Sequence, residues 1–227
     1  ISITNVDEAP TAIALSATSV AETSSAGSSV GTITVTDPDS GEDYAAADLT
    51  LAGTDAASFT IADSGDDVVL QHDNALDYET KTSYSITIAA DDADDSNLAL
   101  GAQAFTITVT DVEITITASQ TGSIAEDAAD DAAVMTVATT GDTDDNDFAI
   151  ASGNGDSIFA IAAATGAITI DDNSNLDYDT TTSYTLGISV SDGDATDTEN
   201  VVISITNVDE APTAIALSAT SVAETSS

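Results

Sequence analysis

Carboxylates are the only plentiful groups in this chain that could do chemistry. The 227 residues include 41 Asp and Glu, but one basic residue (Lys81), one histidine (His72) and no cysteine. With one histidine and no cysteine, the chain lacks the nitrogen and sulfur ligands of a zinc site, and a lone histidine is far more often an ordinary structural residue than the base of a Ser-His-Asp triad. Paired carboxylates also serve glycoside hydrolysis, but the chain is short of aromatics that would position a sugar. We therefore expect no enzyme activity, and cation binding is the chemistry that remains.

The net charge of −40 also restricts the partners. A surface this acidic repels the phosphate backbone of nucleic acids and anionic membranes, and no apolar run is long enough to span a bilayer. We expect neither nucleic-acid binding nor direct membrane contact. The same charges repel one another in the folded state, and divalent cations are the natural means of neutralising them.

The sequence is repetitive. Residues 1–25 recur without a change at 203–227, and the stretch from Leu76 to Tyr84 has a close counterpart from Leu176 to Tyr184. The repeating unit is therefore about a hundred residues, which is enough for one hydrophobic core. We predict four segments: the last strand of a preceding repeat (1–7), a first domain (8–111), a second domain (112–208) and the start of a further repeat (209–227).

Alternating apolar and Thr or Ser residues indicate half-buried β-strands throughout. In the first unit the pattern predicts seven strands, at 12–21, 30–36, 48–52, 58–62, 67–71, 83–90 and 103–110. In the second unit it recurs at 134–138, 183–191 and 200–206. The predicted fold is all-β, with tandem seven-stranded, immunoglobulin-like Greek-key sandwiches. We expect the aromatics in the core, namely Phe59, Tyr84, Phe105, Phe159 and Tyr184.

Strand direction brings acidic residues together where the two domains meet. If the strands run alternately down and up, one pole of the first domain carries Glu22, Asp77, Glu79, Asp111 and Glu113. The facing pole of the second domain carries Asp142, Asp144 and Asp192. Like charges this close need a cation between them, and a set of six to eight oxygen ligands is typical of calcium.

Several motifs in order resemble cadherin repeats. Asp77 and Glu79 lie in a Leu-Asp-Tyr-Glu segment that is similar to the family's Leu-Asp-Arg-Glu, and Asp142 and Asp144 resemble its Asp-x-Asp. The segment 5–10 (Asn-Val-Asp-Glu-Ala-Pro) is similar to the family's linker, although it is one residue shorter. The whole chain resembles tandem cadherin-like repeats of a large bacterial RTX-type surface adhesin.

The resemblance implies calcium at the short linkers that join the domains. It assigns to the central junction Glu22, Asp77, Glu79, Asp111, Glu113, Asp142, Asp144 and Asp192. To the N-terminal junction it assigns Asn5, Asp7, Glu8, Asp37, Asp39 and Asp92. To the C-terminal junction it assigns Glu126, Asp177, Asp179, Asn207 and Asp209.

These features predict a structural extender of a bacterial cell-surface adhesin, made rigid by calcium and anchored at the outer membrane through other parts of the chain. Calcium ions and neighbouring repeats are then the partners, and the chain is monomeric. The alternative is an adhesive module that binds itself, glycans or ice. It is suggested by Thr-x-Thr runs such as Thr32 to Thr34 and Thr106 to Thr108.

Overall fold

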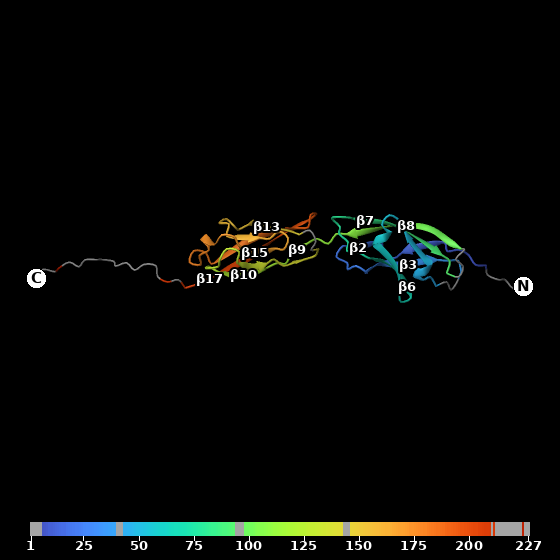
Figure 1. The fold of residues 1–227 in the computed structure, drawn as a ribbon, viewed down its shortest axis with the longest axis horizontal. Coiled ribbons are helices and arrows are strands. Elements are labelled where there is room, and N and C mark those ends of the chain that lie inside the picture. Colours follow the sequence, from blue (N-terminus) through green and yellow to red (C-terminus); the bar gives the residue numbers. More distant parts are fainter. Residues whose placement is uncertain are drawn as a thin grey trace. The chain divides into compact units, whose positions relative to one another are not determined.

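The computed structural model describes residues 6–39, 43–93, 98–142, 146–209, 211 and 224. The described chain is built of β-strands with three short 3-10 helices, which confirms the predicted all-β class (Figure 1). It forms two compact units. The first comprises Ile1–Thr115, Thr139–Asp147 and Val190–Asp197, and the second comprises Ile116–Ala138, Phe148–Ser189 and Thr198–Ser227. The repeat boundaries expected from the sequence stay a prediction.

Two four-stranded sheets form the sandwich of the first unit. One has the order β1-β3-β6-β5 and the other β2-β8-β7-β4. Their bounds are β1 Ala12–Leu15, β2 Ser19–Ala21, β3 Ser29–Thr36, β4 Leu49–Ala52, β5 Phe59–Ser64, β6 Asp67–His72, β7 Ser83–Asp91 and β8 Ala99–Thr110. The neighbours pair antiparallel, except β2 and β8, which are parallel. The chain changes sheet after each of β1 to β4, whereas β5–β6 and β7–β8 are hairpins within one sheet, and this mixture of crossings and hairpins is typical of a Greek-key sandwich.

The single strand predicted over 12–21 is wrong in one respect, because it is two strands in different sheets. β1 pairs with β3, and β2 pairs with β8. The chain crosses between the sheets at Ala17, directly over Gly31. A Cβ atom on Gly31 would lie 2.8 Å from the backbone nitrogen and oxygen of Ala17. Glycine therefore permits the crossing, and the Ser16 hydroxyl accepts the Thr32 N–H beside it at 2.8 Å.

The second half of the chain repeats this plan with strands of different lengths. One sheet has the order β10-β17-β16-β13, a second has β11-β15-β14, and β12 pairs with β9. The bounds are β9 Thr115–Ile116, β10 Thr121–Ala125, β11 Ala133–Thr136, β12 Thr139–Thr140, β13 Asp147–Ser152, β14 Phe159–Ile161, β15 Ala167–Ile170, β16 Ser183–Ser191 and β17 Thr196–Thr206. The 3-10 helices are η1 Ala46–Asp48, η2 Ala56–Ser58 and η3 Asn173–Asn175. The parallel pairing of β10 with β17 matches that of β2 with β8.

The cores are small and aliphatic. Ile86 and Ile88 of β7 are buried, and so are their counterparts Leu186 and Ile188 of β16. Burying each such side chain contributes about 1.5–3 kcal/mol. Each core also holds one edge-to-face aromatic pair. The ring centroids of Phe59 and Tyr84 lie 5.5 Å apart, and those of Phe159 and Tyr184 lie 5.3 Å apart. Both phenylalanines are buried, whereas the two tyrosines and Phe105 are half-buried.

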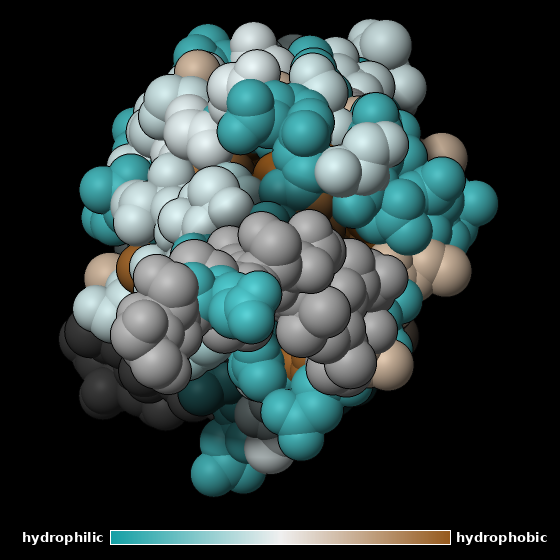
Figure 2. Space-filling model, turned by 90° about the vertical axis from the view of Figure 1, so that its left-hand side faces the viewer, coloured by the Kyte–Doolittle hydropathy of each residue, from teal (hydrophilic) through white to brown (hydrophobic). Residues whose placement is uncertain are grey.

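Few large hydrophobic side chains are exposed among the described residues. On the face shown in Figure 2, hydrophobic atoms are visible mainly in gaps between hydrophilic and intermediate ones. Val6 is the one large hydrophobic side chain that stands exposed among the described residues. None of the helices in the described part of the chain is long and apolar enough to cross a membrane.

Candidate metal centre

Glu22 is held in place by the backbone on two sides. It directly follows β2, and its own N–H donates to the carbonyl of Thr110 at the end of β8, over 3.2 Å. One carboxylate oxygen accepts the N–H of Tyr78 at 2.8 Å, and the other accepts that of Val112 at 2.6 Å. The side chain is 5% exposed. Two backbone donors hold this carboxylate where the loop between β6 and β7 meets the end of β8.

Glu22, Glu79 and Asp142 form a cluster of three carboxylates in the first compact unit. One carboxylate oxygen from each lies within 4.8 Å of those of the other two. Glu22 and Asp142 are buried and Glu79 is half-buried. We call these three residues the carboxylate triad. Among the described residues it is the only such group that could hold a metal ion.

Asp142 reaches the triad because of the glycine before it. Its N–H donates to the carbonyl of Val112 at 3.0 Å, which ties its loop to the segment after β8. Gly141 has a φ of +100°, and a Cβ atom there would collide with the carbonyl oxygen of Glu113. Only glycine takes both this conformation and this close approach without strain.

The triad and its neighbours repel one another. The pKa of Glu79 is raised first by burial and then by the charges of Glu22, Asp192 and Asp111. The pKa of Asp111 is also raised, first by burial and then by the charges of Asp192, Asp194, Glu113 and Asp142. The carboxylates around the triad therefore act on one another electrostatically. A chain with one basic residue has almost no cation of its own to offset it. The donor set therefore fits a divalent cation.

Asp192 is a buried carboxylate whose charge acts on Glu79 of the triad. Burial favours its neutral form, but the N–H groups of Ala195, Ile114 and Asp194 outweigh this, and its pKa is lowered. The distances are 2.8 Å from Ala195, 3.1 Å from Ile114 and 3.2 Å from Asp194. The carboxylate is 1% exposed and stays charged. Backbone donors engage both of its oxygens, as they do those of Glu22, but Asp192 is not among the three carboxylates that lie within 4.8 Å of one another. Its charge adds negative potential at the triad.

The other residues predicted for the central junction are arranged differently. Asp77 does not join the triad, because its carboxylate accepts the N–H and the hydroxyl of Thr80, at 2.6 and 2.7 Å. Glu113 is exposed, and Asp144 lies outside the described residues. Asp194, which the sequence reasoning missed, lines a hollow of about 360 Å³ with Tyr78, Glu79, Thr82 and Gly193. Its Asp-Gly-Asp spacing after β16 was the available signal.

Three of the residues predicted for the N-terminal junction, Glu8, Asp37 and Asp39, are connected by hydrogen bonds. Asp37 accepts the hydroxyl of Tyr44 at 2.6 Å and the N–H of Asp39 at 2.8 Å, while Asp39 accepts the N–H of Glu8 at 2.7 Å. Asp92 is buried and Asp7 is exposed, and Asn5 lies outside the described residues. No triad forms among the described members of this set.

The C-terminal set reproduces half of the central arrangement. The Glu126 carboxylate accepts the N–H groups of Tyr178 and Val208, each at 2.7 Å, as Glu22 accepts those of Tyr78 and Val112. The hydroxyl of Thr180 donates to Asp177 at 2.8 Å and lowers its pKa. The remaining members, Asp179, Asn207 and Asp209, are exposed.

Comparison with known proteins points to one family for part of the chain. The sequence model of the cadherin domain matches residues 16–117. No curated protein matches the chain.

Similar solved structures include the Protocadherin GammaB4 extracellular domain, with 21% identity over 89% of this chain and 34% of that chain, at a TM-score of 0.40. Protocadherin Gamma B2 extracellular cadherin domains 1-5 match with 20% identity over 91% and 42%, at 0.40. The human Desmocollin-1 ectodomain matches with 18% identity over 90% and 43%, at 0.42. The chain thus spans about a third of the Protocadherin GammaB4 structure.

Proposed function

We propose that this chain is a stretch of calcium-stiffened spacer repeats from a long bacterial cell-surface adhesin. The observation that carries the proposal is the triad of Glu22, Glu79 and Asp142, whose oxygens lie within 4.8 Å of one another. The match of residues 16–117 to the cadherin domain supports an adhesive, extracellular role.

Calcium fits the triad better than other metals. All the donors are oxygens, whereas zinc and copper favour nitrogen and sulfur ligands. Three protein carboxylates, with Asp111 beside them, leave room for water or carbonyl oxygens in a shell of six to eight. Magnesium keeps most of its water and uses one or two carboxylates, so it suits this set less well. Bound calcium supplies the positive charge that the cluster lacks.

An ion at the triad would link the two predicted repeats. Glu22 and Glu79 belong to the first repeat, and Asp142 belongs to the second. Binding to the folded state alone adds about 2.7 kcal/mol when free calcium is about a hundred times the dissociation constant. Copying such a unit lengthens the array and creates a new site at each junction, and this is how repeats project a distal binding domain from a surface.

Calcium binding by the full 227-residue chain tests the proposal. We expect isothermal titration with calcium chloride to show saturable binding. We also expect small-angle scattering to give a larger maximum dimension in calcium than in chelator. Asp66→Asn, which removes an exposed charge at the β5–β6 turn, should leave the binding heat and the change in dimension unaltered. Asp142→Asn should abolish both the heat and the change in dimension. The proposal is overturned if millimolar calcium changes neither heat nor dimensions, or if magnesium acts equally well.

No observation favours ice binding by the Thr-x-Thr runs. Thr32 and Thr34 lie on β3, and Thr106 and Thr108 lie on β8. These strands belong to different sheets. The two runs therefore do not form one flat array, which the alternative would need.

A further inference from the structure

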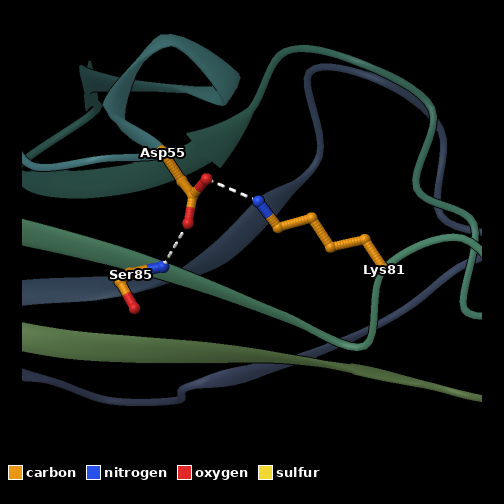
Figure 3. Close-up of polar contacts among 3 residues, drawn as sticks. All are labelled: Asp55, Lys81 and Ser85. Atoms are coloured by element: carbon orange, nitrogen blue, oxygen red, sulfur yellow. Dashed lines mark hydrogen bonds and ion pairs between the residues drawn. The ribbon is translucent and has the colours of Figure 1, made fainter.

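The lone lysine of the chain occupies a defined site on the first sandwich. Its Nζ lies 2.5 Å from Oδ1 of Asp55 and 4.4 Å from the centroid of the Tyr84 ring. The other oxygen of Asp55 accepts the N–H of Ser85 at 2.7 Å. Figure 3 shows Lys81 reaching from its loop to the carboxylate, which is thereby held between a cation and the backbone. An ammonium group is thus bound by a carboxylate and an aromatic ring.

The second unit repeats the aromatic pair and the loop of this site without the cation, and Gly155, followed by Asp156, stands at the position of Asp55. Tyr184 packs edge-to-face on Phe159, as Tyr84 does on Phe59. The N–H of Thr181 donates to the Asp177 carbonyl at 2.9 Å, as that of Lys81 donates to Asp77 at 2.9 Å. Thr181 therefore stands at the position of Lys81. Its side chain is too short to reach across the ring, so no residue of this loop supplies an ammonium.

A hollow of about 220 Å³ lies at this place in the second unit. Its lining includes Asp156, Ser174, Asn175, Asp177, Thr181 and Tyr184. We call it the Tyr184 hollow. Every polar group named here offers an oxygen acceptor, and the two acids make it negative.

The free acceptors suit an ammonium group better than a metal ion. Asp156 is exposed, and its carboxylate takes part in no hydrogen bond or ion pair within the described residues. Both oxygens of Asp177 are engaged by Thr180. One free carboxylate is too few for calcium, whereas an ammonium needs one counter-charge and up to three acceptors. The tyrosine ring adds an attraction that is specific to such cations.

We propose that the Tyr184 hollow binds the alkylammonium group of another molecule, carried by a lysine side chain or a free polyamine. The group must come from outside, because Lys81 is the only lysine or arginine of the chain and is already bound to Asp55. The occupied site on Tyr84 is the internal precedent for this chemistry. The net charge of −40 raises the local concentration of any such cation.

The test is a two-dimensional NMR titration of the full chain in calcium, with Nα-acetyl-lysine amide as the probe. The uncharged norleucine analogue is the matched control ligand. We expect saturable shifts at Asp156, Thr181 and Tyr184 with the lysine probe and none with norleucine. Shifts spread evenly over the exposed acids would mean only a diffuse counter-ion atmosphere and would overturn the proposal.

Three variants sharpen the test. Thr181→Lys, which places a lysine at the position of Lys81, supplies an ammonium to the hollow from within the chain and abolishes binding of the probe. Asp156→Asn and Tyr184→Leu each weaken it by about two- to fivefold, the loss expected from one exposed ion-pair or cation–π contact. Because Tyr184 contacts Phe159, the exposed Asp156 is the variant that leaves the core intact.

Asp66→Asn removes an equal charge elsewhere and leaves binding of the probe unchanged. Unaltered binding by Thr181→Lys or by Asp156→Asn overturns the proposal. Repeating the titration with a lysine-containing tripeptide and with spermidine separates the two sources, since the tighter ligand identifies the kind of partner.

Discussion

Glu22 and Glu126 were both predicted as calcium ligands, but the structure gives them different surroundings. Each accepts two backbone N–H groups at equivalent positions. Only Glu22 belongs to a carboxylate triad among the described residues. The shared role is structural, because both glutamates join a strand end to a loop. The proposed metal-binding role depends on Asp142, which comes from the next predicted repeat.

This difference gives a matched pair of variants. Glu22→Gln and Glu126→Gln each replace one carboxylate acceptor by an amide, and each should cost about 1–3 kcal/mol of unfolding free energy. We expect Glu22→Gln to weaken calcium binding at the triad at least tenfold, whereas Glu126→Gln leaves that affinity unchanged. Calorimetry and urea unfolding measure the two effects. Equal loss of calcium affinity in both variants would contradict the assignment of the triad.

The pair of Asp55 and Lys81 makes a prediction about pH. The hydrogen bond from Lys81, followed by the N–H of Ser85, holds the pKa of Asp55 below its ordinary value of 3.8. A folded-state pKa below the unfolded one means that the pair stabilises the fold above the unfolded value. This contribution is lost as the pH falls through the lower, folded-state pKa.

Carboxyl-carbon NMR titration of wild type and Lys81→Met measures this effect. We expect the pKa of Asp55 to rise toward 3.8 in the variant, and the loss of stability in acid that this carboxylate causes to become smaller. An unchanged titration of Asp55 would show that the ion pair does not hold in solution.

At the scale of elements, periodicity predicted most strands well. The alternation over 183–191 corresponds to β16, Ser183–Ser191. It failed over 12–21, where β1 and β2 have the same alternation but join different sheets. Alternation reports which side chains face inward, and it holds no information on which neighbour a strand pairs with. The crossing depends on the contact between Gly31 and Ala17, which are distant in sequence.

Gly31→Ala tests the crossing. A methyl group there would lie 2.8 Å from the Ala17 backbone, so we expect a loss of about 1–3 kcal/mol, the usual cost of overpacking. Gly101→Ala is the control, because open space surrounds Gly101 on β8. It should be neutral or stabilising by less than about 1 kcal/mol. Urea unfolding monitored by circular dichroism compares them, and equal effects would refute the steric explanation.

At the scale of the whole molecule, the charge of −40 makes stability depend on ionic conditions. Self-repulsion opposes the compact state and is screened by salt. Raising sodium chloride from about 0.01 M to about 0.5 M shortens the screening length from about 30 Å to about 4 Å. We expect the melting temperature in chelator to rise over this range, and to rise less in calcium. A melting temperature that is independent of salt in chelator would mean that the repulsion is unimportant.

The sequence alone determined the all-β class, the repeat of about a hundred residues and the acidic residue types that favour calcium. These properties follow from local patterns and composition, and they need no knowledge of contacts. Only the tertiary structure decided which carboxylates meet. The carboxylate of Asp77 accepts a hydrogen bond from Thr80 in its own loop, whereas those of Glu79 and Asp142 lie close to that of Glu22. That choice depends on backbone donors and on a positive φ at Gly141, which arise only when distant segments pack together.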